Sequence, residues 1–238
     1  MVVDKPAPLL VHPTRPGGPV TLWDGLRDLF AFELANGGQI SIINRLDRET
    51  SGVTLIATKQ ETARAFGLAM QQRKIGKRYV AMCWGWPDED EFEVDAPIMR
   101  RGDLGEYPIY VKQTVHEDGV PCRTGFKVQS KHRGHDGTKF SLIEAKPYTG
   151  RMHQIRVHLH HMGFPVVGDK LYGPDDANYL EFIETGWTES LAQRLLLPRQ
   201  ALHSWQLEVE IDGSKRAWEA PVPGEFRNLF ESGSREGD

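Results

Sequence analysis

The sequence predicts a single α+β, or mixed α/β, domain. Of the 238 residues, 39% are hydrophobic and 26% are charged, which is typical of a globular protein with a buried core. Segments with period-two hydrophobic alternation are interspersed with segments of helical periodicity, and no Pro- or Ser-rich linker or internal repeat divides them. We therefore expect one domain over residues 1–223, followed by a tail, 224–238, that is poorly ordered at its end.

The first predicted elements lie in the N-terminal third of the chain. The apolar run at 53–57 predicts a strand, and the helical stripe after it extends to about residue 72. Thr58 with Glu61 three residues later predicts a capping box at the start of this helix. Alternating apolar residues at 77–85 then predict a strand that is covered on both faces.

The remaining elements follow in the same mixed order. Strands are expected at 124–130 and 139–147, and a helix at 153–162, where Gly163 and Pro165 provide a stop. Two acidic helical stretches between 176 and 195 precede a strand at 202–211 with strict alternation.

Cysteine usage and hydropathy point to a cytoplasmic protein. Cys83 and Cys122 lie in predicted strands without CxxC spacing, so we expect two free cysteines in the core. The apolar runs reach about five residues, whereas a membrane span needs about 20. Asp4 and Lys5 stand where a signal peptide would need its apolar stretch. We expect no membrane association.

The charges are segregated along the chain although the net charge is only -4. Residues 59–78 hold six basic residues against one acidic residue, and residues 121–160 hold eight against two. Residues 84–120 show the opposite balance, with ten acidic against three basic residues. This pattern fits a polyanion-binding face with an acidic back, and ordinary solvated surfaces are the alternative.

Two segments concentrate the polar residues that carry chemistry. The first, IINRLDRETSGV (42–53), places Asp47 between two arginines on a loop before a strand. Such an aspartate can be a nucleophile, a general base or a metal ligand, or it can simply cap a turn. The second, TGRMHQIRVHLHHMGFPVVGDKLYG (149–173), places Arg151 and Arg156 near a helix start, where backbone N–H groups favour anions.

Together these two segments closely resemble the motifs of the RluA-type pseudouridine synthases, which convert uridine to pseudouridine in RNA. VDKPAPLLVHP, KRYVAMCWG and LHSWQLEVE also resemble family segments in the same order, so the similarity extends from about Val2 to Pro223. The chain departs from the family pattern at three positions, Pro8, Asn44 and Met152, where the family usually has Gly, His, and Thr or Ser. We also expect no accessory RNA-binding domain before Val2.

The resemblance implies the pseudouridine synthase fold: a mixed, largely antiparallel sheet flanked by helices, with Asp47 at the base of a basic cleft. It implies an isomerase that acts on uridine in ribosomal or transfer RNA without a cofactor. Asp47 is the implied catalytic carboxylate, which either attacks the sugar or starts deprotonation there. Arg156 is its implied basic partner, which would hold the pKa of Asp47 down.

The resemblance also assigns roles to other residues. Tyr79 would stack on the target base and help to remove the C5 proton, although its strand alone would suggest a core tyrosine. Arg45 would fill the space that the flipped-out uridine leaves. Phosphate or ribose contacts at the rim are expected from five residues, with surface ion pairing as the alternative for the basic ones. These five are Arg48, Lys77, Arg151, His153 and Gln154.

Other functions fit the sequence less well. The histidines at 153, 158, 160 and 161 invite a zinc site, but only His158 and His161 have helical ligand spacing, so we expect no metal. A retaining glycosidase would need a second carboxylate about 5 Å from the first, and no other acid stands in a comparable motif. Asp169 is expected to be a turn residue. A non-catalytic RNA-binding module on the same scaffold is the main alternative, and a monomer is expected.

Overall fold

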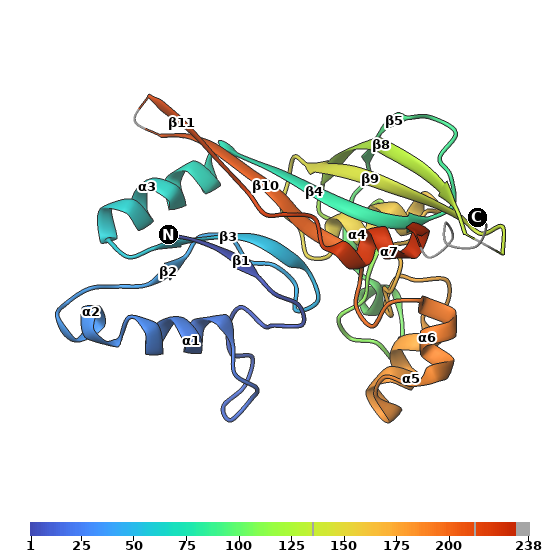
Figure 1. Cartoon of the computed structure of the whole chain (residues 1–238), viewed down its shortest axis with the longest axis horizontal. Coiled ribbons are helices and arrows are strands. Elements are labelled where there is room, and N and C mark those ends of the chain that lie inside the picture. The colour runs from blue at the N-terminus through green and yellow to red at the C-terminus, as the bar shows by residue number, and fades with distance from the viewer. Residues whose placement is uncertain (135, 212, 232–238) are drawn as a thin grey trace, which may run out of the picture. The chain divides into compact units, whose positions relative to one another are not determined.

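The computed structural model describes residues 1–134, 136–211 and 213–231. It divides the chain into two compact units (Figure 1). Unit 1 contains Met1–Arg78 and His203–Pro221, and unit 2 contains Tyr79–Leu202 and the residues from Val222 on. The single domain over 1–223 stays a prediction. A helix occupies Gly224–Glu231 of the predicted tail, and the end of that tail, 232–238, lies outside the described residues.

The sheet of unit 1 is built around strand β3 (Ser51–Ala57), whose seven residues are all buried. β1 (Val2–Lys5) and β2 (Ser41–Ile42) pair with β3 in antiparallel fashion. β10 (Leu202–Ile211) pairs with β3 in parallel, and β11 (Ser214–Glu219) forms an antiparallel hairpin with β10. Because β3 is buried along its whole length, it carries a continuous small and apolar sequence, SGVTLIA.

The helices of unit 1 bury the side chains of β3. Helix α3 (Gln60–Gln71) packs Phe66 and Ala69 into a cluster with Val53 and Leu55. Helix α1 (Leu22–Leu29) packs into a second cluster that contains Ile56, and the short helix α2 (Ala31–Ala35) follows it. Val53 and Leu55 alternate with Ile56 along β3, so the two clusters lie on opposite faces of the strand.

The capping box predicted from Thr58 and Glu61 is wrong. Lys59 is the N-cap of α3 and has no side-chain capping bond, so Glu61 occupies the second helical position instead of the third. A capping box does occur at α1, where the Thr21 hydroxyl and the Asp24 carboxylate each accept a hydrogen bond from the other residue's backbone N–H.

Unit 2 contains an antiparallel sheet in the order β4, β9, β8, β5. These strands are β4 (Ile75–Trp84, whose first four residues belong to unit 1), β9 (Lys139–Pro147), β8 (Arg123–Arg133) and β5 (Glu91–Asp95). Between β5 and β8 in the chain, β6 (Ile98–Arg100) and β7 (Gln113–Val115) form a separate antiparallel pair. A short 3-10 helix, η1 (Arg101–Leu104), follows β6.

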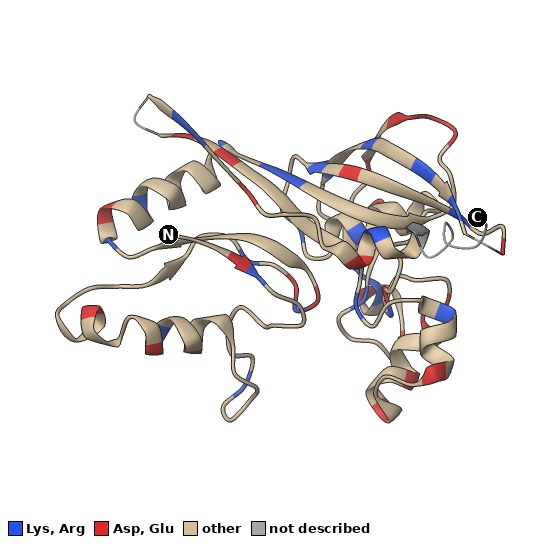
Figure 2. Ribbon diagram, viewed as in Figure 1, with Lys and Arg blue, Asp and Glu red and all other residues tan. Residues whose placement is uncertain are grey.

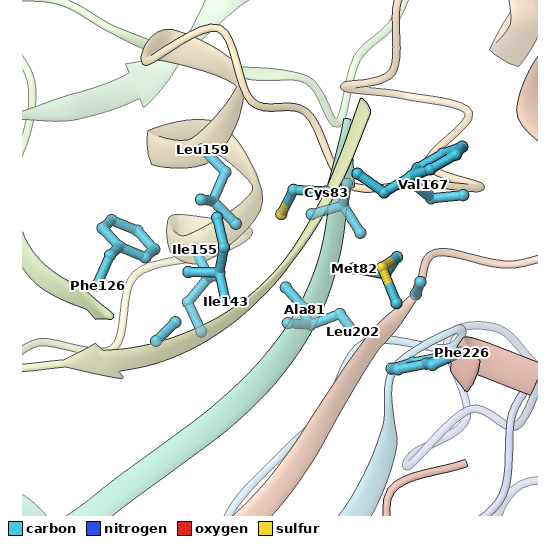
Figure 3. Packing of buried hydrophobic residues seen from close by; sticks show 14 of the residues in the cluster. Ala81, Met82, Cys83, Phe126, Ile143, Ile155, Leu159, Val167, Leu202 and Phe226 are labelled. Atoms are coloured by element: carbon cyan, nitrogen blue, oxygen red, sulfur yellow. The ribbon is translucent and has the colours of Figure 1, made fainter. Parts of the chain in front are cut away.

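Helix α4 (Gln154–His161) supplies the core of unit 2. Figure 3 shows Ile155 and Leu159 pointing from α4 toward Ile143 of β9, and the same cluster contains Ala81 and Cys83 of β4. Helices α5 (Ala177–Thr185), α6 (Glu189–Leu195) and α7 (Gly224–Glu231) complete the unit. The mixed, largely antiparallel architecture with flanking helices is confirmed.

The two cysteines behave as the sequence predicts. Cys83 and Cys122 are free and buried, and burial raises the pKa of both thiols, that of Cys122 to about 11. Both thiols are therefore protonated at neutral pH. Among the described residues, no helix is both long enough and apolar enough to cross a bilayer.

Candidate active site

Asp47 lies on a short segment between β2 and β3 that is folded back onto β3. The buried side chain of Asn44 donates to the Val53 carbonyl oxygen at 3.0 Å, and its own oxygen accepts from the Leu55 N–H at 2.8 Å. The Asp47 carbonyl oxygen accepts from the Thr50 N–H at 3.1 Å, which closes a tight turn. The carboxylate-bearing residue thus sits on an anchored turn rather than on a loose loop.

The side chains of this segment differ in their exposure to solvent. Asn44 and Leu46 are buried, whereas Arg45 and Arg48 are exposed and Asp47 is half-buried. The two guanidinium groups are therefore accessible to a polyanion, while the carboxylate between them is partly shielded from water. Partial burial of this kind strengthens interactions with nearby charges.

A buried lysine ties the N-terminus of the chain to the same segment. Lys5 is fully buried, and its ammonium group donates to the carbonyl oxygens of Pro6 and Leu9, each at 2.9 Å, and of Arg48 at 3.3 Å. The Leu9 N–H also donates to the Arg48 carbonyl oxygen at 2.9 Å. A charged donor that serves several carbonyl groups is a strong anchor, so residues 5–9 help to fix the position of Arg48 and its neighbours.

Two predicted site residues lie on β4. Tyr79 is half-buried, is paired in register with Ala145 of β9 and packs partly against the core cluster of unit 2. Lys77 is also half-buried, and burial lowers the pKa of its ammonium group. A lysine held in this way gains more from a phosphate contact than a fully solvated one, because a nearby anion offsets its lost hydration.

Two predicted site residues, Arg151 and His153, lie just before the first residue of α4. Arg151 is exposed. His153 adopts the left-handed conformation at the N-cap (φ 58°), and its Nδ1 lies 2.8 Å from the Tyr172 hydroxyl. That hydroxyl also accepts from the Gln113 N–H at 2.8 Å. His153 is therefore positioned by β7 and by the loop after α4.

Gln154 does not lie at an exposed rim, where we predicted it. The residue is buried, and its amide oxygen accepts from the Thr149 hydroxyl (2.8 Å) and from the Arg151 N–H (3.0 Å). Its amide nitrogen donates to the Arg123 carbonyl oxygen and to the Thr124 hydroxyl, both at 2.9 Å. These bonds use both ends of the amide, so Gln154 holds the loop that carries Arg151.

Arg156 is buried and forms a two-point ion pair with Asp169. Its Nε lies 2.6 Å from Oδ2 of Asp169, and its Nη2 lies 2.9 Å from Oδ1. Burial alone would raise the pKa of Asp169, but the charge of Arg156 and the hydrogen bonds to the carboxylate hold that pKa below its usual value. Asp169 is a turn residue, as predicted, since Oδ1 accepts from the N–H groups of Leu171 and Tyr172. The sequence did not reveal its ion pair.

Pairing of β5 with β8 brings the acidic segment of the chain next to a basic strand. Three ion pairs join these strands or their ends, Arg123 with Glu93, Lys127 with Glu91 and Lys131 with Asp90, at N···O distances of 3.3, 2.6 and 3.0 Å. Figure 2 shows blue and red positions side by side in this part of the sheet. The segregation of charge along the sequence is therefore not a segregation in space here, and this part of the chain fits the alternative of ordinary solvated surfaces.

Comparison with known proteins identifies the family. The family described as RNA pseudouridylate synthase matches residues 1–161, which include Asp47, Tyr79 and Arg156. The chain belongs to this family. The matched region covers more than half of the chain and contains the first motif (42–53) and the start of the second (149–161).

Curated relatives of this pseudouridylate synthase family member match about three quarters or more of its sequence. It is 34% identical, over 98% of its length, to the ribosomal large subunit pseudouridine synthase D of Nitrosomonas europaea, and it covers 62% of that protein. It is 33% identical, over 74% of its length, to the dual-specificity RNA pseudouridine synthase RluA of Vibrio parahaemolyticus, of which it covers 67%. The chain thus spans about two thirds of the length of these relatives.

Solved structures show the same fold at lower sequence identity. Human RNA Pseudouridylate Synthase Domain Containing 4 superposes with a TM-score of 0.70 at 23% identity, over 96% of this chain and 87% of that chain. Human RNA Pseudouridylate Synthase Domain Containing 1 gives a TM-score of 0.69 at 24% identity, over 93% of this chain and 79% of that chain.

Proposed function

We propose that this protein isomerises uridine to pseudouridine in RNA, with ribosomal RNA as the first substrate class to test and transfer RNA as the second. The observation that carries the proposal is the family match over residues 1–161, because this region contains the whole of the first motif (42–53) and the start of the second (149–161). Asp47 of the first motif lies on an anchored turn. The names of the curated relatives, which include ribosomal large subunit enzymes, support the choice of substrate.

The proposed reaction breaks the C1'–N1 bond of uridine, turns the freed base and joins its C5 to C1'. No electrons are gained or lost and no external group is transferred, so no cofactor is needed. Asp47 is the proposed catalytic carboxylate, which acts on the sugar either as a nucleophile or as a base. Its partly buried position favours either role, because a carboxylate with fewer solvating waters is more reactive.

Access to the glycosidic bond requires the target uridine to leave its stack, at a cost of a few kcal/mol. Arg45 is exposed two residues before Asp47, and its planar guanidinium suits the space that the flipped nucleotide leaves. Tyr79 is proposed to stack on the flipped base and to assist loss of the C5 proton. Arg156 is proposed to keep Asp47 ionised.

The proposed RNA contacts outside the reacting nucleotide are electrostatic. Arg48 and Arg151 are exposed and Lys77 and His153 are half-buried, which suits contacts to phosphate or ribose. Gln154 is assigned a positioning role for the Arg151 loop, because its amide bonds are made within the protein. We propose further that the protein acts as a monomer and that it acts in the cytoplasm, because its candidate substrates, ribosomal and transfer RNA, are present there.

Tritium release from RNA transcribed with 5-tritiated uridine tests the proposal, because C5 loses its hydrogen when it bonds to the sugar. Ribosomal and transfer RNA pools are assayed separately with wild type, Asp47→Asn and Asp47→Ala. Asp28→Asn, an exposed acid in the same unit, is the matched control. We expect release from one pool with wild type and Asp28→Asn, and none with either Asp47 variant.

Two outcomes would overturn the proposal. Comparable release by Asp47→Asn, in protein with an unchanged melting temperature, would remove Asp47 from the catalytic role. Absence of release from both pools by wild-type protein that binds the same RNA tightly would favour the non-catalytic RNA-binding module.

A further inference from the structure

The guanidinium of Arg156 is constrained at its edge and at its face. At the edge, Nε and Nη2 donate to the two different oxygens of Asp169, a geometry that fixes the guanidinium plane. At the face, the ring centroid of Tyr172 lies 4.9 Å from Cζ of Arg156. The Asp169 bonds use two of the five N–H groups of the arginine, so the direction of the other three follows from this arrangement.

The loop that carries Asp169 is itself held rigidly. Asp169 Oδ1 accepts from the N–H groups of Leu171 and Tyr172 at 2.9 and 3.0 Å. Glycines stand on both sides: a Cβ on Gly168 (φ 76°) would lie 2.0 Å from the Arg199 carbonyl oxygen, and one on Gly173 would lie 2.2 Å from the Asp169 carbonyl oxygen. Close backbone approach at both positions leaves the carboxylate little freedom to move.

Stability alone is a poor explanation for this arrangement. A buried ion pair loses the hydration of both charges, and replacing such a pair by apolar residues is often neutral or stabilising. Asp169 is fully buried and Arg156 is nearly so. A pair with two bonds and a stacked ring is better suited to fix an orientation.

We propose that Asp169 is a positioning residue that sets the orientation of Arg156 for the reaction. The inference rests on the proposed function, because Arg156 acts there as the basic partner of Asp47. Asp169 touches neither RNA nor the reacting atoms in this scheme. Its whole effect on turnover passes through Arg156.

A double-mutant cycle tests the inference with tritium release as the assay. We expect Asp169→Asn to lower kcat by roughly 10- to 100-fold with KM for the RNA changed less than about threefold, because a small misplacement of a catalytic group has effects of this size. In an Arg156→Gln background the same substitution should lower kcat by less than about twofold. Glu225→Gln is the matched control, since it breaks the Arg199–Glu225 ion pair in the same unit, and it should leave kcat unchanged.

Two results would refute the positioning role. One is a kcat for Asp169→Asn within about threefold of wild type. The other is an equal loss in the wild-type and Arg156→Gln backgrounds, because independent effects add. If Asp169→Asn fails to fold, Asp169→Glu replaces it, and an unchanged kcat in that variant, whose carboxylate is displaced by one methylene, would also refute the role.

A readout without RNA separates this inference from the proposed function. The Arg156 Nε–H, observed by NMR, should exchange slowly with water in wild type and much faster in Asp169→Asn. Equal exchange rates of the Arg156 Nε–H in wild type and in Asp169→Asn would refute the positioning role of Asp169, whether or not the protein has activity. Slow exchange in wild type combined with no tritium release would refute the proposed function and leave the ion-pair geometry intact.

Discussion

Gly52 of β3 and Ser204 of β10 are paired in register on parallel strands, so closely that a Cβ on Gly52 would lie 2.2 Å from the Ser204 carbonyl oxygen. Gly52 also has a φ of 113°, which side-chain-bearing residues rarely adopt. Because Gly52 follows Asp47 by only five residues, this close approach determines where the turn that carries the carboxylate enters the sheet.

Replacing Gly52 by alanine should destabilise the protein severely. The added Cβ would collide with backbone, which cannot move aside as a flexible side chain could, and the φ angle adds strain. We expect a loss of about 3 to 5 kcal/mol in the free energy of unfolding, measured by urea denaturation. Gly67→Ala is the control, because Gly67 is exposed within α3 and its added Cβ would meet no atom within 4 Å. This control should gain about 0.5 to 1 kcal/mol.

Replacing Asn44 by alanine should loosen the turn that carries Asp47. The substitution removes the buried side-chain acceptor of the Leu55 N–H, and it leaves the Val53 carbonyl oxygen with a longer bond from the Ser204 hydroxyl, at 3.4 Å. We expect a loss of about 2 to 3 kcal/mol in unfolding free energy and a reduced rate of tritium release. Asn36→Ala removes an exposed amide that bonds to the Phe32 carbonyl oxygen, and it should cost less than about 1 kcal/mol. Equal losses in the two variants would contradict the anchoring role of Asn44.

Acidification should destabilise the protein through His158. Burial lowers the pKa of this histidine, and the hydrogen bond to the Ala96 carbonyl oxygen only partly opposes the shift. The Ala96 carbonyl oxygen can only accept, so Nε2 carries the proton of the neutral imidazole and Nδ1 accepts from the Thr124 hydroxyl, which itself accepts from Gln154. Protonation of Nδ1 would disrupt this chain of hydrogen bonds.

The sign follows from proton binding. Below about pH 6.5 the unfolded chain binds a proton at His158 that the folded protein does not, so stability falls as the pH drops from there toward the lower pKa of the folded state. Denaturation of wild type and His158→Asn between pH 7.5 and 5.5 should show a steeper loss for wild type, by at most about 1.4 kcal/mol per pH unit. His12→Asn, which removes a histidine of unit 1, should behave as wild type. Parallel curves for wild type and His158→Asn would contradict the prediction.

The strands and helices could be predicted because their periodicity is local. The apolar run 53–57 and the alternation along β4 and β10 are visible in the sequence itself, whereas β3 begins two residues earlier than predicted, at Ser51. The start of α3 was misplaced because a Thr and a Glu at capping-box spacing do not decide which residue is the N-cap. Propensity and spacing leave such boundaries open by one or two residues.

The contacts that hold the candidate site could not be predicted in the same way. Arg156 and Asp169 are thirteen residues apart, and this spacing does not predict that a helix and the loop after it bring the two side chains into contact. Gln154 was predicted as a phosphate or ribose contact at the rim, whereas the fold buries it and uses its amide in hydrogen bonds within the protein. Ion pairs between β5 and β8 likewise depend on strand pairing, which places segments of opposite charge side by side.

The buried ammonium of Lys5 makes the first residues of the chain part of the turn that bears Asp47. Three carbonyl oxygens, including that of Arg48, converge on this one cation. Changes at the N-terminus, such as a deletion that reaches residue 5 or a fusion that strains β1, thus act on the segment around the carboxylate. In this protein, a segment more than forty residues away in sequence therefore belongs to the support of the proposed catalytic carboxylate when variants are designed.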